Sequence, residues 1–207
     1  MSAGDRPPTS HERGSGQPWA ASYLPGPAPW DIGAPQPAVV ELIAAGAFHG
    51  DVLDAGCGTG DNMVAIAAHG LRVLGIDVAE PALAMARAKA TGRGLDIEFA
   101  LADALHLERL RRRFDTVLDS ALFHTFDATE QATYAAGLAT ITAPGATLSL
   151  LCFSDTGPNP GPHPVSRDAI AAAFAPPDWQ ITTIAPALLR TRFDEASPAW
   201  LATIRRH

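Results

Sequence analysis

The most constraining feature of the sequence is the stretch DVLDAGCGTG at residues 51–60. Its first five residues, DVLDA, form a short apolar run that is typical of a buried strand. Three glycines at alternate positions follow, Gly56, Gly58 and Gly60, and a helical pattern, DNMVAIAAHG, begins directly after them. Glycines at such a turn allow the backbone to approach a ligand closely. The stretch therefore predicts a strand, a tight turn that faces a ligand, and a helix.

The rest of the chain continues this alternation of strand-like and helix-like segments. Strand-like runs lie at 51–55, 71–77, 95–103, 114–123, 146–154, 179–189 and 199–206. Helix-like runs lie at 37–48, 61–70, 78–92, 127–142 and near 166–175. Asp127 and Glu130 form a capping pair at the start of the fourth helix. Strands that alternate with helices favour right-handed crossovers. We therefore expect an α/β fold with a doubly wound, Rossmann-like, seven-stranded and mostly parallel sheet.

Length and composition predict one globular domain with a tail. Residues 1–22 are rich in Pro, Gly, Ser and charge and show no periodicity, so we expect a disordered tail there and a single domain over 23–207. No apolar run reaches the roughly 18 residues that a membrane span needs, and the N-terminus lacks the apolar core of a secretory signal. We expect a cytoplasmic protein that does not bind membranes and keeps Cys57 and Cys152 as free thiols.

The charge balance bears on the kind of partner. The chain carries 15 Lys and Arg against 22 Asp and Glu, a formal net charge of -7, and its basic residues are scattered apart from RLRRRF at 109–114 and a final RRH. Binding to nucleic acid normally needs a basic face. We therefore expect a small, neutral or cationic ligand and no nucleic-acid partner. The seven histidines are dispersed, and no metal site is expected.

Three kinds of ligand compete for the glycine turn. A nucleoside triphosphate would require Gly-Lys-Ser or Gly-Lys-Thr, whereas the chain has GTGDNM. A dinucleotide would require a third glycine where Asp61 stands, and that carboxylate would lie near the pyrophosphate. S-adenosylmethionine (SAM) carries no phosphate, and Asp54 offers an acceptor for its ammonium group. The comparison favours SAM.

Two further acids follow the next two strands of the predicted sheet. Asp77 ends the second strand, where one carboxylate can accept both hydroxyls of a ribose. Asp103, followed by Ala104, ends the third and can bond the adenine amine. Apolar walls for the adenine ring are expected from Ile76, Val78 and Leu105. The full set of expected cofactor-binding residues is Trp30, Asp54, Gly56, Cys57, Gly58, Gly60, Asp77, Val78, Asp103, Ala104 and Asp119.

With VLDAGCGTG, GID and AD at three successive strand ends, the chain resembles the class I SAM-dependent methyltransferases. PWDIGAPQP at 29–37, GDVLDAGCG and FDTVLDSALFH together resemble the mycobacterial heterocyclic toxin methyltransferases, relatives of the thiopurine and tellurite-type enzymes. This resemblance implies O-methylation, and so detoxification, of aromatic heterocycles such as 2-alkyl-1-hydroxyquinolin-4-ones. Other small acceptors, such as a phenol, a thiol or a thiopurine, and a SAM-binding role without catalysis stay open.

Two side chains near the expected methyl position have alternative interpretations. Trp30, with Tyr23 and Trp19 upstream, either closes the cleft over the ligands or anchors the N-terminal segment to the core. His124 follows the fourth strand and is the candidate catalytic residue, as a base or a hydrogen-bond partner of the acceptor; the alternative is an ordinary loop histidine.

Asp119 lies at the end of the strand that precedes His124. It either contacts the methionine moiety, orients His124 or caps the strand end. Cys57 is more typical of a small apolar filler than of a nucleophile, and Cys152 is expected in the core.

Overall fold

The protein is described by a computed structural model that covers residues 6–24, 26–157 and 162–207. Its seven strands are β1 (Asp51–Ala55), β2 (Arg72–Asp77), β3 (Glu98–Leu101), β4 (Phe114–Ser120), β5 (Thr142–Phe153), β6 (Trp179–Leu189) and β7 (Ser197–Arg206). They form one sheet in the order β3-β2-β1-β4-β5-β7-β6. Strands β1 to β5 pair in parallel, and β7 lies antiparallel between β5 and β6. The expected α/β, doubly wound and mostly parallel sheet is confirmed.

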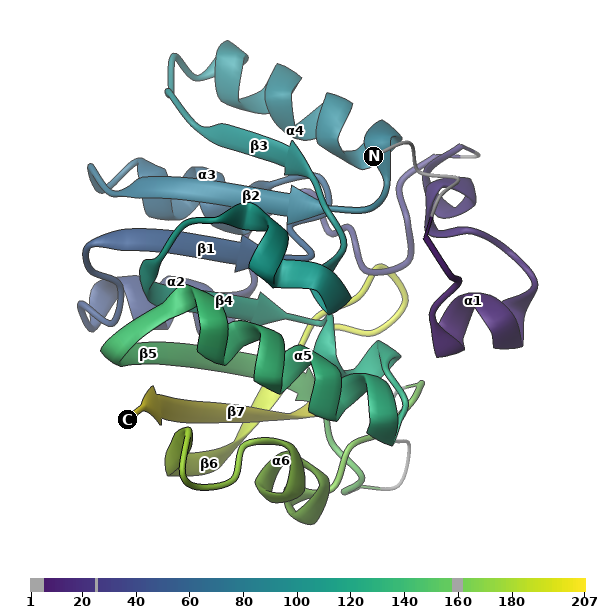
Figure 1. The fold of residues 1–207 in the computed structure, drawn as a ribbon. Coiled ribbons are helices and arrows are strands. Elements are labelled where there is room, and N and C mark those ends of the chain that lie inside the picture. The colour runs from purple at the N-terminus through teal and green to yellow at the C-terminus, as the bar shows by residue number, and fades with distance from the viewer. Residues whose placement is uncertain (1–5, 25, 158–161) are drawn as a thin grey trace.

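Helices cover both faces of this sheet (Figure 1). The α-helices are α1 (Ser10–Ser15), α2 (Pro37–Ala44), α3 (Asp61–Ala67), α4 (Glu80–Gly92), α5 (Ala128–Ile141) and α6 (Arg167–Ala173). Three short 3-10 helices are η1 (Trp19–Tyr23), η2 (Ala104–Leu110) and η3 (Phe123–Thr125). In Figure 1, α5 and α6 lie in front of the sheet, whereas α2 and α3 lie behind it.

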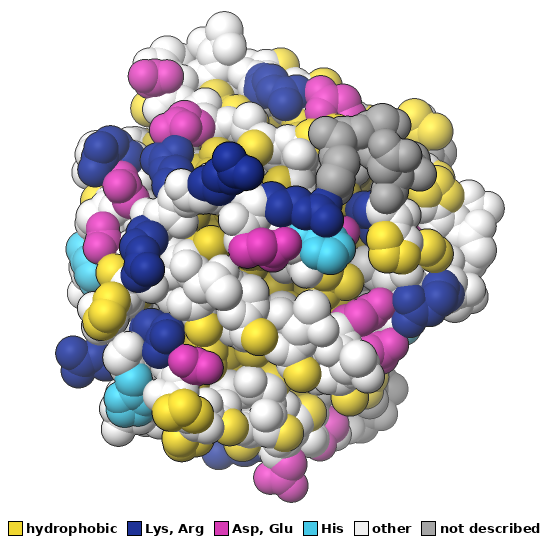
Figure 2. Space-filling view, viewed as in Figure 1, with side chains coloured by type: hydrophobic (Ala, Val, Ile, Leu, Met, Phe, Trp, Pro, Cys, Tyr) yellow, Lys and Arg dark blue, Asp and Glu magenta, His cyan; other side chains and the backbone are white. Residues whose placement is uncertain are grey.

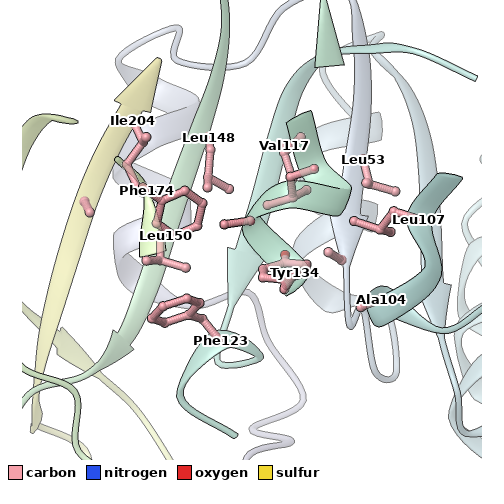
Figure 3. Close-up of a cluster of buried hydrophobic side chains, with 14 of the residues drawn as sticks. Leu53, Ala104, Leu107, Val117, Phe123, Tyr134, Leu148, Leu150, Phe174 and Ile204 are labelled. Atoms are coloured by element: carbon pink, nitrogen blue, oxygen red, sulfur yellow. The ribbon is translucent and has the colours of Figure 1, made fainter. Parts of the chain in front are cut away.

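The core follows from the two-residue period of the strands, which sends successive side chains to opposite faces. In β1, Val52 joins the cluster formed with Val39 of α2 and Met63 of α3. The next residue, Leu53, joins the larger cluster on the other face, which includes Tyr134 of α5. Figure 3 shows this larger cluster, with side chains of four neighbouring strands directed toward the covering helices. Cys152 is fully buried there, as expected.

Capping residues set the ends of several elements. The Asp127 side chain accepts from the amides of Thr129 and Glu130, and the Glu130 side chain accepts from the Asp127 amide, so the expected capping pair of α5 is confirmed. Helix α2 ends at Ala44, earlier than the expected residue 48, because the chain turns through Gly46 at a φ of 69°. Such a left-handed conformation cannot continue a helix.

The strand order places the ligand-binding edge. The chain runs from β1 to β2 and β3 on one side, and then crosses to β4 and β5 on the other. Ligands of doubly wound sheets bind at such a reversal, beyond the carboxyl ends of the strands. In Figure 1 the arrowheads of β1 to β5 point to the side where α1 lies.

Residues 6–22 differ from the expected disordered tail. Thr9 and Glu12 form a capping box at the start of α1, and the helix docks on α5 through Glu130, which accepts from the Ser10 amide at 2.8 Å and from Arg13 at 3.1 Å. The expectation of disorder rests on the polar composition of the segment. These contacts order the segment in spite of that composition. We call residues 6–24 the N-terminal arm; residues 1–5 of the expected tail lie outside the described residues.

The surface carries both signs of charge. Figure 2 shows basic and acidic side chains interspersed across one face of the molecule. Within the described ranges, no helix is long and apolar enough to cross a membrane. Within the same ranges, no group of three or more His, Cys, Asp or Glu side chains is placed to hold a metal ion.

Candidate active site

A cavity of about 370 Å³ lies at the carboxyl ends of the parallel strands. Gly56 follows β1, Asp77 ends β2, Ser120 ends β4 and Phe153 ends β5, and all four line the cavity. The N-terminal arm and the loop at 190–196 between β6 and β7 contribute further walls. The cavity therefore lies at the sheet edge where the topology predicts a ligand. The N-terminal arm and the β6–β7 loop enclose the cavity.

The glycine turn combines an unusual backbone with close packing. Gly56 has a φ of 70°, and a Cβ there would lie 3.1 Å from Cβ of Leu122. Gly60 has a φ of 82°, and a Cβ there would lie 2.9 Å from that of Ala86 in α4. Gly56 lines the cavity, whereas Cys57, Gly58 and Gly60 are not among its lining residues. A side chain at either glycine would thus strain the turn, and Gly56 is the point where the turn meets the cavity.

Asp77 connects the glycine turn to the second strand. One carboxylate oxygen accepts from the Gly58 amide at 2.9 Å, and the other accepts from the Ala79 amide at 2.8 Å. Burial raises the pKa of Asp77, and these amide bonds oppose that shift. Asp77, Val78 and Ile76 all line the cavity. Because each carboxylate oxygen has more than one lone pair, Asp77 can still accept from ligand hydroxyls.

Asp103 caps η2 beside Asp77. Its Oδ1 accepts from the Leu105 amide at 2.9 Å, and the side chain is buried. Asp103 and Ala104 line the cavity, as does Ala102 before them. The cap fixes one oxygen of the carboxylate and leaves the group available to an amine donor in the cavity. Leu105, which the sequence suggested as an apolar wall, is not among the lining residues.

Asp54 and Asp119 form a buried acidic pair below the cavity. Burial raises the pKa of Asp54 to about 8, with a further contribution from Asp119, and burial raises the pKa of Asp119 to about 7. Asp119 Oδ1 accepts from the amides of Leu122 and Phe123, and the Tyr134 hydroxyl interacts with the same carboxyl. Oδ2 of Asp54 has no hydrogen-bond partner. Neither residue lines the cavity. The structure therefore does not bring these two expected cofactor-binding residues to the cavity surface, although in the chain each lies one or two positions before a residue that lines the cavity.

Three aromatic rings cover the glycine turn. The indole of Trp30 donates to the Tyr23 hydroxyl at 3.0 Å, and Trp30 also meets Trp19 edge to face at 5.6 Å between ring centroids. All three rings line the cavity, and the Tyr23 hydroxyl lies 3.4 Å from where a Cβ of Gly58 would stand. The rings therefore line the cavity, and the contacts of Trp30 with Tyr23 and Trp19 anchor the arm.

His124 lies at the other side of the cavity, on η3. Its ring is 4.7 Å from that of Phe153, and its Nδ1 is buried without a hydrogen-bond partner. Burial lowers the pKa of His124 to about 3. The imidazole is therefore neutral above about pH 4. It is better suited to form a hydrogen bond with the methyl acceptor than to hold a proton.

Several residues that line the cavity were not predicted from the sequence. The arm contributes Thr9 and His11, the loop before α6 contributes Pro162 and His163, and the β6–β7 loop contributes Phe193. Thr9 and Glu12 match the Ser/Thr-x-x-Glu pattern of a capping box, which was the one local signal for α1. The other residues reach the cavity only through long-range packing, which the sequence does not display.

Comparisons with known proteins identify the family of the chain. Residues 52–145 match the methyltransferase domain family. The chain is 36% identical over 170 residues to the 2-heptyl-1-hydroxyquinolin-4(1H)-one methyltransferase of Mycobacteroides abscessus, covering 80% of this chain and 74% of that protein. A structure solved for the conversion of a disulfide bond into a thioacetal group during echinomycin biosynthesis has a TM-score of 0.80 at 40% identity, covering 87% and 84%. The magnesium protoporphyrin IX methyltransferase of Synechocystis PCC 6803 with bound SAM shares the fold, with a TM-score of 0.64 at 23% identity and coverage of 82% and 76%.

The fold, the motifs at the strand ends and these matches place the chain in the class I SAM-dependent methyltransferases. SAM is its cofactor. Within that class, the chain belongs to the same family as the hydroxyquinolone methyltransferase of M. abscessus and is a small-molecule methyltransferase.

Proposed function

We propose that the enzyme methylates the hydroxyl oxygen of a small aromatic heterocycle of the alkylhydroxyquinolone kind and thereby detoxifies it. The observation that carries this proposal is one cavity in which the cofactor-motif residues Asp77 and Asp103 share walls with Phe126, Phe153 and Leu189. Apolar walls of this kind favour a flat, lipophilic acceptor. The name of the M. abscessus relative supports the substrate class. Methylation would also block ionisation of the hydroxyl.

Each cofactor-motif residue then has a role that its contacts permit. Asp77 would accept from the ribose hydroxyls and Asp103 from the adenine amine, while Val78 and Ala104 would flank the adenine ring. Asp54 and Asp119 do not line the cavity, and when ionised they would favour the ammonium through their charge rather than by direct contact. The backbone of Gly56, Cys57, Gly58 and Gly60 would shape the turn beside the methionine portion, and Trp30 would close the cavity over it.

Bound SAM supplies a methyl group on a positively charged sulfur, which is already activated for displacement. The chain's own contribution is to align the acceptor and exclude water. His124 would hold the acceptor oxygen through its unpartnered Nδ1, and Phe153 beside it would limit the tilt of the imidazole. This role needs no charge on the histidine, in agreement with its lowered pKa.

A sulfur acceptor is the second candidate, because a structure with 40% identity was solved for a reaction at the sulfurs of a disulfide. The test is a competition assay with purified enzyme and SAM, in which 2-heptyl-1-hydroxyquinolin-4(1H)-one competes with a thiopurine and an alkyl thiol. The proposal expects kcat/KM for the hydroxyquinolone to exceed that of either thiol by about 100-fold or more, an advantage of roughly 3 kcal/mol in the transition state. Preference for a thiol would favour the second candidate. Bound SAM without product from any acceptor would favour a non-catalytic role.

A further inference from the structure

Two histidines that are far apart in the sequence meet at the cavity. His11 Nδ1 lies 3.2 Å from His163 Nε2, within hydrogen-bond distance, and the two rings are 5.3 Å apart at 71°. His11 lies on α1 of the N-terminal arm, and His163 lies in the loop between β5 and α6. Both line the cavity that His124 also lines. The fold therefore joins two imidazoles at the acceptor end of the proposed site.

The ring of His11 is packed on an aromatic neighbour, and the backbone of His163 has an uncommon conformation. His11 stacks on Trp19, with 4.3 Å between ring centroids and 14° between planes. His163 has a φ of 53°, a left-handed conformation that is uncommon for a residue with a Cβ. Backbone strain of this kind persists only where surrounding contacts impose it, and it concentrates at functional sites. The two histidines thus have a defined arrangement in the ligand-free site.

The pair also stands between the cavity and the solvent. A second hollow shares His11, His124 and His163 with the cavity and extends toward α5 and α6. His163 is exposed, whereas His11 is half-buried and His124 is buried. A proton received inside the cavity therefore has a hydrogen-bonded route to water through the pair.

Burial, together with the neighbouring His163, favours the neutral form of His11. Burial lowers the pKa of His11, His163 lowers it further, and Glu12 on the same helix opposes the shift. Other charged groups nearby are Arg13 on α1, its partners Asp127 and Glu130 on α5, and Arg6, which pairs with Glu12. His124 on η3 is itself disfavoured as a cation by both histidines of the pair. A neutral His11 can accept a proton, whereas His124 is poorly placed to keep one.

We propose that the hydrogen-bonded pair of His11 and His163 is the proton acceptor of the methyl transfer, an inference that rests on the proposed hydroxyl acceptor. In this scheme the acceptor O–H bond breaks and its proton forms a bond with Nε2 of His11. The proton shared between the rings moves from Nδ1 of His11 to Nε2 of His163, and Nδ1 of His163 releases its proton to water. The acceptor oxygen uses the freed electron pair to bond the methyl carbon while the carbon–sulfur bond breaks and its electrons stay on sulfur. S-adenosylhomocysteine and the methyl ether are the products.

The test compares three variants of the full-length enzyme with the wild type. His11→Phe keeps a flat ring against Trp19 and removes both nitrogens, and His163→Asn keeps a residue that tolerates the left-handed backbone. His69→Gln is the matched control, because His69 is exposed and does not line the cavity. We would measure kcat and KM for 2-heptyl-1-hydroxyquinolin-4(1H)-one from pH 5.5 to 9.5, and SAM affinity by calorimetry.

The inference predicts a loss that depends on pH. Below the pKa of the acceptor hydroxyl, kcat of His11→Phe and His163→Asn is expected to fall on the order of 100-fold, since a positioned base contributes this much. Above that pKa the acceptor arrives ionised, so kcat should return to within about threefold of the wild type. His69→Gln should follow the wild type throughout, and SAM affinity should not change in any variant.

Two results would overturn the inference alone: an unchanged kcat at low pH in both variants, or an equal loss at every pH, which indicates a structural role. A different result separates the proposed function from the inference. If the wild-type enzyme binds SAM and forms no methyl ether at any pH, the hydroxyl acceptor itself is wrong, and the inference falls with it.

Discussion

Asp77 is the residue whose contacts tie the cofactor-binding turn together. It accepts from Gly58 and Ala79 and lines the cavity. Asp77→Asn keeps one oxygen that can accept a hydrogen bond from one of these amides, but it removes the negative charge of the carboxylate. We expect SAM affinity to fall about 10-fold or more, because hydrogen bonds to charged groups contribute roughly 1.5–3 kcal/mol. Calorimetric titration with SAM measures this, with Asp96→Asn, an exposed residue, as the control. Equal SAM affinity in the two variants would show that Asp77 does not bind the cofactor.

His124 offers a second prediction for a single residue. His124→Ala is expected to lower kcat for a hydroxyl acceptor about 5-fold while SAM affinity stays unchanged, because one neutral hydrogen bond contributes about 1 kcal/mol. His124→Asn presents an amide near the position of Nδ1 and should restore most of the rate. Steady-state kinetics on both variants provides the measurement. If the Asn variant is as slow as the Ala variant, a hydrogen bond from Nδ1 is not what His124 contributes.

The residues of the glycine turn and the strand-end acids could be located from the sequence, because each follows a recognisable strand and the sheet topology brings strand ends together. Gly56, Asp77 and Asp103 indeed share one cavity. The burial of Asp54 and Asp119 below that cavity could not be predicted. The turn after β4 places Leu122 against Gly56 and directs the amides of Leu122 and Phe123 to Asp119, and such packing is not visible in the sequence.

At the scale of the element, the N-terminal arm is the main departure from the sequence prediction. Its Pro, Gly and Ser content indicates disorder, and α1 has only six residues, too few to be stable alone. Its stability comes from Glu130 and Asp127, more than 100 residues away along the chain. Such partners are invisible to local patterns, and so is the approach of His163 to His11.

The docking of this arm gives a testable prediction. The Ser10 hydroxyl has the Glu130 carboxylate and the Thr125 carbonyl within reach as acceptors of its one proton, and its oxygen accepts from the Asp127 amide. Ser10→Ala should therefore raise amide exchange across α1 about 10-fold, since a lost bond to a charged group is worth more than 1 kcal/mol. The acceptor KM should rise as well. Ser15→Ala, an exposed change on the same helix, is the control, and indistinguishable exchange in the two variants would contradict the docking account.

At the scale of the whole molecule, the buried acids couple stability to pH. The pKa of Asp54 is about 8 and that of Asp119 about 7 in the folded, ligand-free protein, above the unfolded value near 3.8. Their contribution to the free energy of unfolding is complete below about pH 4 and is lost progressively as pH rises from about 4 to about 8, by at most about 1.4 kcal/mol per pH unit for each group. The lowered pKa of His124 acts in the opposite direction, but only below about pH 6.5.

We therefore expect the melting temperature of the ligand-free enzyme to fall between pH 6.5 and 8 and to level off above pH 8. Saturating SAM should flatten this fall, because an ammonium beside the two carboxyls favours their ionised forms. Differential scanning calorimetry of the wild type and of an Asp54→Asn, Asp119→Asn double variant measures the effect. The double variant should show a flatter profile without SAM, and a profile as steep as that of the wild type would contradict the role of the two acids.

The central claim is that one cavity holds both the methyl donor and a small aromatic hydroxyl acceptor. Its most direct test incubates the purified enzyme with SAM carrying a deuterated methyl group and 2-heptyl-1-hydroxyquinolin-4(1H)-one. Tandem mass spectrometry then locates the label, and S-adenosylhomocysteine is counted in parallel. The account predicts the labelled methyl group on the hydroxyl oxygen, with one S-adenosylhomocysteine for each product. Label on carbon or on a ring nitrogen, or S-adenosylhomocysteine formed without labelled product, would contradict it.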